Sequence, residues 1–253
     1  MEVTILGSGT CVPRLKRSSP GLAVQVGKEQ LLLDGGAGTL RRMLEAGIDY
    51  KQLDYIFYTH LHPDHTAELI PILFAIKNTP GWVRERPLKI FGPSGFGKFF
   101  KQLSQIYGDW IISPSYKLTV QELKEDLQDF GSWLIKTRPV RHSYDLTCIG
   151  YRIEEKGTGV LVYSGDTDYC PEIISLAEAA DMAVLECSYP DSHKIPGHLT
   201  PSLAGRIAQQ AQCKKLVLTH LYPACDEVDM VAECKKVFEG DIVVAEDLMR
   251  LVI

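Results

Sequence analysis

Four side chains of the types that bind transition metals lie within six consecutive residues, in the segment Thr59–His65. His60 and His62 point to the same side if the backbone is extended, and Asp64 and His65 turn toward a second point if a helix begins there. Crowded imidazoles raise each other's cost of protonation, whereas neutral imidazoles that bind a cation avoid that cost. The segment therefore predicts two metal ions a few ångströms apart, and a solvated turn is the weaker interpretation.

Other residues of the same types stand where predicted strands end. They are Asp34 after 30–33, His142 after 133–141, Asp166 after 160–163 and His220 after 216–218. A lone Asp or His at the end of a strand is more often structural or solvated than a metal ligand. Each of these signals by itself is therefore ambiguous.

Short runs of aliphatic and β-branched residues alternate with Gly, Pro and Ser, and a few segments have helical periodicity. Strands are predicted at 3–5, 22–26, 30–33, 55–58, 88–91, 116–120, 133–136, 150–154, 160–163, 182–185, 216–219, 242–244 and 249–252, and helices near 40–46, 68–76, 172–179, 203–210 and 228–238. No linker, charge block or repeat divides the chain. We therefore expect one α/β domain over residues 1–253, in which two sheets pack face to face with helices outside, an αββα sandwich.

The composition restricts the class of protein. With 253 residues, 45% of them hydrophobic, the chain can bury a large core, and a net charge of −5 gives no broad basic surface for duplex nucleic acid. The N-terminus lacks the features of a signal peptide, and no apolar run approaches the roughly 18 residues that span a bilayer. We therefore expect a cytoplasmic protein without a membrane partner. Seven cysteines with no C-x-x-C pair predict reduced thiols, and they favour neither a disulfide framework nor a thiolate zinc site.

The motif H-x-H-x-D-H is the first of a series that resembles the metallo-β-lactamase superfamily over essentially the whole chain. The later members of the series are His142, the run Ser164-Gly165-Asp166-Thr167 and the pair Thr219-His220, and the turn Asp34-Gly35-Gly36 precedes the motif. The resemblance implies the αββα fold and a site for two metals. It assigns His60, His62, His142 and Asp166 to the first ion, and Asp64, His65, His220 and the second oxygen of Asp166 to the other.

Ligands rich in imidazole and free of thiolate favour two zinc ions, with manganese and iron as alternatives. The superfamily's di-iron oxidoreductases carry Glu where this chain has His62, and no flavin-binding extension follows. The resemblance therefore implies a metal-dependent hydrolase.

Two further regions resemble ribonuclease Z and its smaller relatives within the superfamily. The segment 6–10 is similar to the opening loop of that branch, and Glu186 and His198 are similar to a pair that lies beside the metals. In that pair the His protonates the leaving oxygen of a phosphodiester and the Glu orients the His, while a metal-bridged hydroxide, oriented by Asp64, attacks phosphorus. The alternative is that Glu186 is an ordinary carboxylate at a strand end and that His198 only precedes a helix capped by Thr200.

Ribonuclease Z enzymes insert a long arm that grips tRNA between the equivalents of His142 and Asp166. Here only 23 residues separate the two, and two predicted strands account for them. We therefore expect a phosphodiesterase for a small nucleotide, a cyclic phosphate or another phosphodiester, and RNA is not favoured. The open alternatives are a ribonuclease Z-like RNA endonuclease, a thioester, ester or lactone hydrolase, which the Glu186 and His198 pair disfavours, and a non-catalytic binding protein, which the complete ligand set disfavours.

Relatives in this branch are commonly homodimers, so we expect a homodimer. The apolar and aromatic segment Phe96–Trp110 is a candidate interface, although a core helix accounts for it equally well. The sequence does not give the shapes of the loops 78–86 and 189–196, on which substrate specificity depends.

Overall fold

The computed structural model describes all residues, 1–253, and contains two seven-stranded sheets. In chain order the strands are β1 (Glu2–Gly7), β2 (Gly21–Val26), β3 (Glu29–Leu33), β4 (Leu53–Phe57), β5 (Leu88–Pro93), β6 (Leu118–Leu123), β7 (Leu127–Asp129), β8 (Trp133–Val140), β9 (Cys148–Glu155), β10 (Gly159–Tyr163), β11 (Met182–Glu186), β12 (Lys215–Thr219), β13 (Asp241–Val244) and β14 (Arg250–Val252). The first sheet has the order β14-β1-β2-β3-β4-β5-β6, and the second has the order β13-β12-β11-β10-β9-β8-β7.

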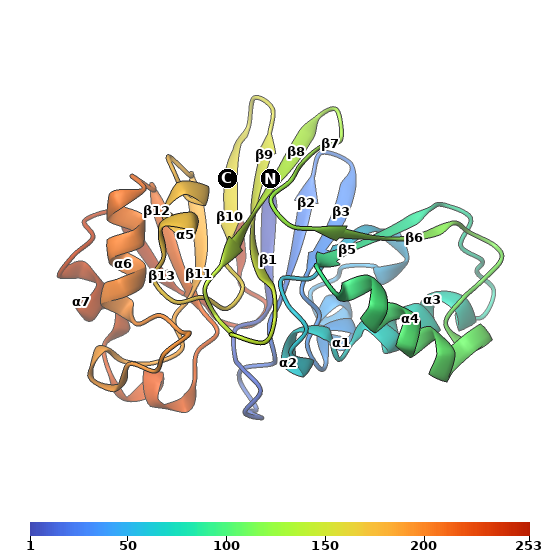
Figure 1. Ribbon diagram of the computed structural model, residues 1–253, viewed down its shortest axis with the longest axis horizontal. Coiled ribbons are helices and arrows are strands. Elements are labelled where there is room, and N and C mark those ends of the chain that lie inside the picture. The colour runs from blue at the N-terminus through green and yellow to red at the C-terminus, as the bar shows by residue number, and fades with distance from the viewer.

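Helices lie on the outer side of each sheet, as Figure 1 shows. The α-helices are α1 (Thr39–Glu45), α2 (Pro63–Thr66), α3 (Leu69–Asn78), α4 (Phe96–Tyr107), α5 (Pro171–Leu176), α6 (Pro201–Gln210) and α7 (Met230–Lys235), and the 3₁₀ helices are η1 (Tyr50–Gln52), η2 (Gly108–Trp110), η3 (Asp191–His193) and η4 (Pro223–Glu227). Helices α1–α4 flank the first sheet and α5–α7 flank the second (Figure 1). This arrangement confirms the expected αββα sandwich. None of the helices combines the length and apolar composition that a bilayer span requires.

The main apolar core lies between the two sheets. It joins side chains such as Leu33 and Phe57 of the first sheet to Ile135, Tyr151 and Val184 of the second, all of them at most 1% exposed. Two further clusters pack the outer face of each sheet against its helices. Because the central strands are covered on both faces, they are nearly continuous apolar runs, which is why they were readily predicted.

The structure departs from the expected elements at several places: α4 and the 3₁₀ helices were not among the expected helices, and three further differences have local causes. Strand β7 was not predicted because it is a three-residue edge strand with two exposed positions. Helix α2 begins at Pro63, earlier than expected, since proline is compatible with the first helical position. Thr200 stands at the N-cap position of α6, as the alternative interpretation of His198 had it, but its side chain makes no capping hydrogen bond, and the Ser202 amide donates to Asp191 Oδ1 at 3.0 Å instead.

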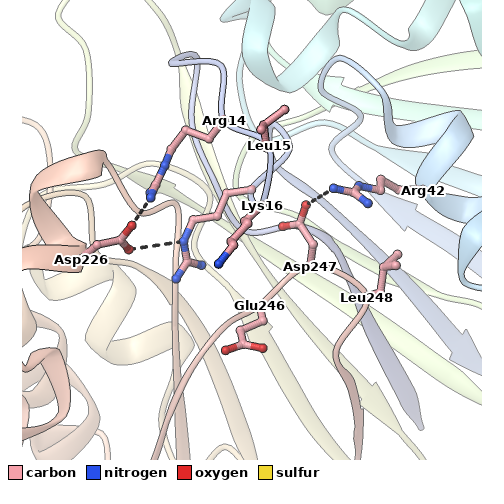
Figure 2. Close-up of a pocket in the computed structure, with 9 residues that line it drawn as sticks. Arg14, Leu15, Lys16, Arg42, Asp226, Glu246, Asp247 and Leu248 are labelled. Carbon is pink, nitrogen blue, oxygen red and sulfur yellow. Dashed lines mark hydrogen bonds and ion pairs between the residues drawn. The ribbon is translucent and has the colours of Figure 1, made fainter.

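Asp247, which lies just before β14, anchors the opening loop of the chain to the rest of the fold. Its carboxylate accepts hydrogen bonds from the backbone amides of Ser8 (2.8 Å) and Ser18 (2.7 Å). The Arg42 guanidinium lies 2.9 Å from the same carboxylate, and Figure 2 shows this pair in the wall of a surface pocket. The Asp247 side chain is 5% exposed, so it closes a buried polar junction between the two ends of the sequence.

We expect Asp247→Ala to lower the free energy of unfolding by about 2–4 kcal/mol, because two backbone amides and one guanidinium lose a buried charged partner. Urea unfolding followed by circular dichroism measures the change. Asp226→Ala is the matched control: this carboxylate pairs with Arg14 in the same pocket (Figure 2), but its side chain is 43% exposed, so a loss below about 1 kcal/mol is expected. Equal losses in the two variants would contradict the anchoring role of Asp247.

Candidate metal centre

The predicted site residues follow strands whose carboxyl ends meet at one edge of the sandwich. Asp34 follows β3 and the segment 60–65 follows β4, and these two strands are parallel. In the second sheet Asp166, Glu186 and His220 lie at or just beyond the ends of the parallel strands β10, β11 and β12. Parallel strands bring their carboxyl ends to the same edge, so residues far apart in the sequence converge there.

One group of donor atoms comes from His60, His62, His142 and Asp166. Nε2 of His60 and Nε2 of His142 lie 3.0 and 3.2 Å from Nδ1 of His62. Oδ2 of Asp166 lies 3.7 Å from Nε2 of His142 and 3.9 Å from Nε2 of His60. The four donor atoms all lie within 4.8 Å of one another, which is the arrangement expected for ligands of one ion.

A second group comes from Asp64, His65 and His220, and it adjoins the other oxygen of Asp166. Oδ1 of Asp166 lies 3.2 Å from Nε2 of His65 and 3.3 Å from Nε2 of His220. Oδ2 of Asp64 lies 3.6 Å from Nε2 of His220. The two oxygens of Asp166 therefore face different groups, so that this carboxylate can bridge two ions.

The chemistry of the donors fits a metal cofactor. Ligands about 2.0–2.1 Å from a tetrahedral ion lie roughly 3.3 Å from one another, close to the separations above. Three of the donors, Nε2 of His65, Nε2 of His220 and Oδ1 of Asp166, are buried and have no hydrogen-bond partner. Buried polar atoms without partners are costly, and a shared cation satisfies all three at once.

Four of the five imidazoles in these groups are held at their other ring nitrogen by an oxygen atom. Nδ1 lies 3.0 Å from Thr59 Oγ1 in His60, 2.8 Å from Asp34 Oδ2 in His65, 2.9 Å from the Gly197 carbonyl in His142 and 2.9 Å from Ser188 Oγ in His220. Such partners set the tautomer and the ring orientation of metal-binding histidines. In each of these rings Nε2 is left free to point into the centre.

Asp34 supports the loop that carries the first motif. Its carboxylate accepts hydrogen bonds from the Thr59 amide (2.8 Å), the Thr59 hydroxyl (2.9 Å) and the Tyr163 hydroxyl (2.9 Å), in addition to its contact with His65. Asp34 has a φ of 56°, a left-handed conformation that costs an L-residue free energy and that this network holds in place. Gly36 lies so close to the start of α2 that a Cβ would be 2.0 Å from the carbonyl oxygen of Asp64. The turn therefore supports the loop that carries the first motif.

Glu186 and His198 form a buried pair beside the second group. The Glu186 side chain is 1% exposed, and its Oε1 lies 2.8 Å from Nδ1 of His198. Although burial disfavours the charged imidazole, the hydrogen bond and charge of Glu186 raise the pKa of His198 above its ordinary value. A ring nitrogen of His198 lies within 4.8 Å of donor atoms of Asp166 and His220, so the imidazole faces the centre.

Burial and neighbouring charges shift the pKa values of the donors in different directions. Although burial opposes it, the charges of Asp166 and Asp34 raise the pKa of His65 well above its ordinary value. Burial, together with the charge of His65, lowers the pKa of His60 well below its ordinary value. Burial opposes ionisation of Asp166, but the adjacent His220 and His65 hold the pKa of that carboxyl well below its usual range. A neutral imidazole at His60 and a carboxylate at Asp166 are the forms that bind metals, whereas His65 has to lose its proton when a cation binds.

A polar cavity of about 580 Å³ opens beside the first group of donors. Its walls include His62, His142, Arg141, Tyr144 and Asp168, and only one of its nine lining residues is apolar. The Arg141 side chain is exposed at the mouth and takes part in none of the hydrogen bonds or ion pairs of the structure. In the sequence, the signal for Arg141 is limited to its position next to His142.

Comparison with known proteins identifies the family. The profile described as "Beta-lactamase superfamily domain" matches residues 30–221, which include every donor described above. The chain belongs to the beta-lactamase superfamily. The ribonuclease Z of Archaeoglobus fulgidus is 27% identical, covering 99% of this chain and 97% of that protein. That alignment runs over 307 positions, whereas the chain has 253 residues, so the relative carries insertions that this chain lacks.

Solved structures of the superfamily agree with this result. The metallo-beta-lactamase fold protein YhfI from Bacillus subtilis superposes with a TM-score of 0.84 at 26% identity, covering 99% of this chain and 98% of that chain. The short form of human tRNase Z superposes with a TM-score of 0.81 at 24% identity, covering 100% and 99% of the two chains, and this likeness supports the fold. The predicted recognition is therefore confirmed: the chain lies in the ribonuclease Z-like branch of the superfamily and is a metal-dependent hydrolase.

Proposed function

We propose that residues 1–253 form one hydrolase domain with a dinuclear zinc centre, and that it hydrolyses a small phosphodiester such as a nucleotide or a cyclic phosphate. The observation that carries this proposal is the buried Glu186 and His198 pair. Its imidazole lies next to the donor atoms of Asp166 and His220. Hydrolysis of a thioester does not need a second acid at that position, because a thiolate leaves readily without a proton. A phosphodiester with an alkoxide leaving group does need one.

The metals would be held by His60, His62, His142 and Asp166 at the first position and by Asp64, His65, His220 and Asp166 at the second. When bound, two such ions supply charge neutralisation for a phosphoryl group and activation of water near neutral pH. Zinc is proposed because the donors are imidazoles and carboxylates without thiolate, and manganese and iron are the alternatives.

Residues of the chain would supply the proton for the leaving oxygen and orient the attacking water. His198 would donate the proton on its Nε2 to the leaving oxygen, because its Nδ1 is held by Glu186. Glu186 would keep the imidazole oriented and favour its charged form. Asp64 would orient the attacking water through its carboxylate, which lies at the edge of the second group.

The surroundings of the centre favour a small substrate. Residues 143–165 form only β9, β10 and their connections, so no arm extends from this part of the chain. The polar cavity of about 580 Å³ can hold a nucleotide-sized group, with Arg141 placed to meet a negative charge and Tyr144 a base. The runner-up is a ribonuclease Z-like RNA endonuclease, which the ribonuclease Z relative favours.

Zinc-loaded protein assayed against four substrate panels tests the proposal. The panels are cyclic nucleotides and linear phosphodiesters, tRNA precursors, thioesters, and lactones. We expect turnover of the first panel to exceed that of the others. Preferential cleavage of tRNA precursors would establish the runner-up, and preferential turnover of thioesters or lactones would refute a phosphodiesterase.

We also propose a homodimer, with the interface over an apolar groove between α3 and α4. The groove has a volume of about 740 Å³, and its walls include Ile70, Phe74, Leu103 and Trp110. Phe74 and Trp110, both in the walls of this groove, are 49% and 65% exposed, respectively, and apolar patches at the surface mark interaction sites. The segment Phe96–Trp110 forms α4 and η2, of which Phe96 is buried in the core while Trp110 is exposed.

A substitution that places a charged side chain in the groove tests the proposed dimer interface. We expect Phe74→Glu to convert the dimer to a monomer in light scattering after size exclusion, because a carboxylate in the interface would be desolvated. Val83→Glu is the control, since Val83 is 67% exposed and is not part of the groove. A native protein that is already monomeric, or a Phe74→Glu variant that stays dimeric, would refute this interface.

A further inference from the structure

The hydroxyl of Ser188 lies between the acid pair and the second group of metal donors. Its Oγ is 2.8 Å from Oε2 of Glu186, 2.9 Å from Nδ1 of His220 and 3.0 Å from Nδ1 of His198. Ser188 is fully buried. It stands two positions after Glu186, where an extended backbone places both side chains on the same face.

The numbers of protons and lone pairs on these groups determine the direction of each hydrogen bond of Ser188. A serine hydroxyl has one proton and two lone pairs, and the Glu186 carboxylate can only accept, so the Ser188 proton goes to Oε2 of Glu186. Oγ must then accept from Nδ1–H of His220. Nδ1–H of His198 points mainly at Oε1 of Glu186, which lies 2.8 Å away, closer than Ser188. Both imidazoles are therefore protonated at Nδ1, and Nε2 of His220 is left free to bind a metal.

No other group can replace Ser188 for His220. Nδ1 of His220 has no other hydrogen-bond partner in the structure, whereas His198 keeps Glu186. The backbone around the serine is also fixed, because its amide donates to Oε2 of Glu186 at 3.0 Å and its carbonyl accepts from the Tyr222 amide at 3.3 Å. The hydroxyl is thus held in one position, and no neighbouring group can replace it as the acceptor for Nδ1–H of His220.

We propose that Ser188 is a positioning residue that transmits the charge of Glu186 to the metal-binding imidazole of His220. One oxygen of Glu186 then orients the acid His198, and the other, through Ser188, orients a ligand of the second metal. The arrangement is a carboxylate and histidine pair with a hydroxyl inserted between them, and such outer partners fix the tautomer and raise the basicity of metal-binding histidines. The proposal rests on the proposed ligand role of His220, but it does not depend on the substrate.

The experiment measures metal retention. Zinc-loaded native protein and variants are titrated with a competing chelator, and the dissociation constants of the more weakly and more tightly bound ions are compared. We expect Ser188→Ala to weaken one of the two ions about 10- to 100-fold and to leave the other unchanged. Cys187→Ala is the matched control, because it removes one buried γ atom at the adjacent position without touching an imidazole, and we expect it to bind zinc as the native protein does. Ser188→Thr, which restores a hydroxyl, should recover most of the lost affinity.

Two further variants separate this role from a general loss of packing. Glu186→Gln should weaken the same ion, but should add little to Ser188→Ala in the double variant, because Glu186 acts on His220 through the serine. His198→Ala should leave both ions in place. Native-like zinc retention in Ser188→Ala, equal weakening in Cys187→Ala, or additive losses in the double variant would overturn the proposal. If instead no zinc-loaded variant or native protein hydrolyses a phosphodiester, the proposed substrate fails while the metal titrations still decide the role of Ser188.

Discussion

Replacing His198 by Ala is expected to lower turnover about 10²–10⁴-fold on a phosphodiester with a poor, alkoxide-like leaving group, because no other side chain is placed to protonate the leaving oxygen. Both metals should remain bound, since His198 is not one of the proposed ligands. Steady-state kinetics with metal content determined on the same sample measures both quantities. Glu186→Gln should show a smaller loss, because it misorients the imidazole without removing it.

The control for this prediction is the leaving group. A nitrophenolate departs without much help from an acid, so hydrolysis of an activated ester should depend mainly on the metals, and the loss in His198→Ala should shrink. If both substrates slow equally at unchanged metal content, His198 positions the substrate or the fold, and the main mechanistic support for the proposed phosphodiesterase is lost. If the metals are lost together with the activity, His198 is itself a ligand, which its proximity to Asp166 and His220 makes a concrete alternative.

Replacing Asp166 by Ala is expected to remove both metals at once, from about two ions per chain to nearly none, because its two oxygens face the two groups of donors. His220→Ala should lose mainly the second ion. Elemental analysis after purification without chelator and reconstitution with zinc measures the stoichiometry.

Two further variants distinguish a loss of metal ligands from a loss of the fold. Asp166→Asn keeps the size of the side chain but not its charge, and it should also bind poorly if the carboxylate bridges two cations. Asp145→Ala removes an exposed carboxylate at the mouth of the polar cavity and should keep both ions. Equal metal retention in Asp166→Ala and His220→Ala, or a native protein that takes up no zinc or manganese, would contradict the dinuclear assignment.

Local sequence was sufficient to predict the four candidate ligands of the segment 60–65 and most of the strands. His60, His62, Asp64 and His65 are neighbours in the chain, so the geometry of an extended segment followed by one helical turn already places them around two points. The central strands were predictable for a similar reason, since burial on both faces makes them continuous apolar runs. The exposed three-residue strand β7 lacks that pattern, and propensity alone could not reveal it.

His142, Asp166 and His220 could be placed only through the order of motifs, because nothing in their own surroundings distinguishes a ligand from a structural residue. Their convergence is a property of the sandwich, in which parallel strands of two sheets end at one edge. Resemblance supplied that information before the structure did. It did not supply the orientation of the imidazoles, which depends on oxygen atoms contributed by other loops.

The sequence by itself thus determined the types and order of the candidate ligands and of the Glu186 and His198 pair, and with them the proposed chemistry. Only the tertiary structure decided how those groups are held. Ser188 meets His220 across 32 positions, Tyr163 meets Asp34 across 129, and Asp247 meets Ser8 across 239. Hydrogen bonds between such distant residues have no local periodicity or spacing in the sequence, because they arise only when the packed sheets bring the loops together.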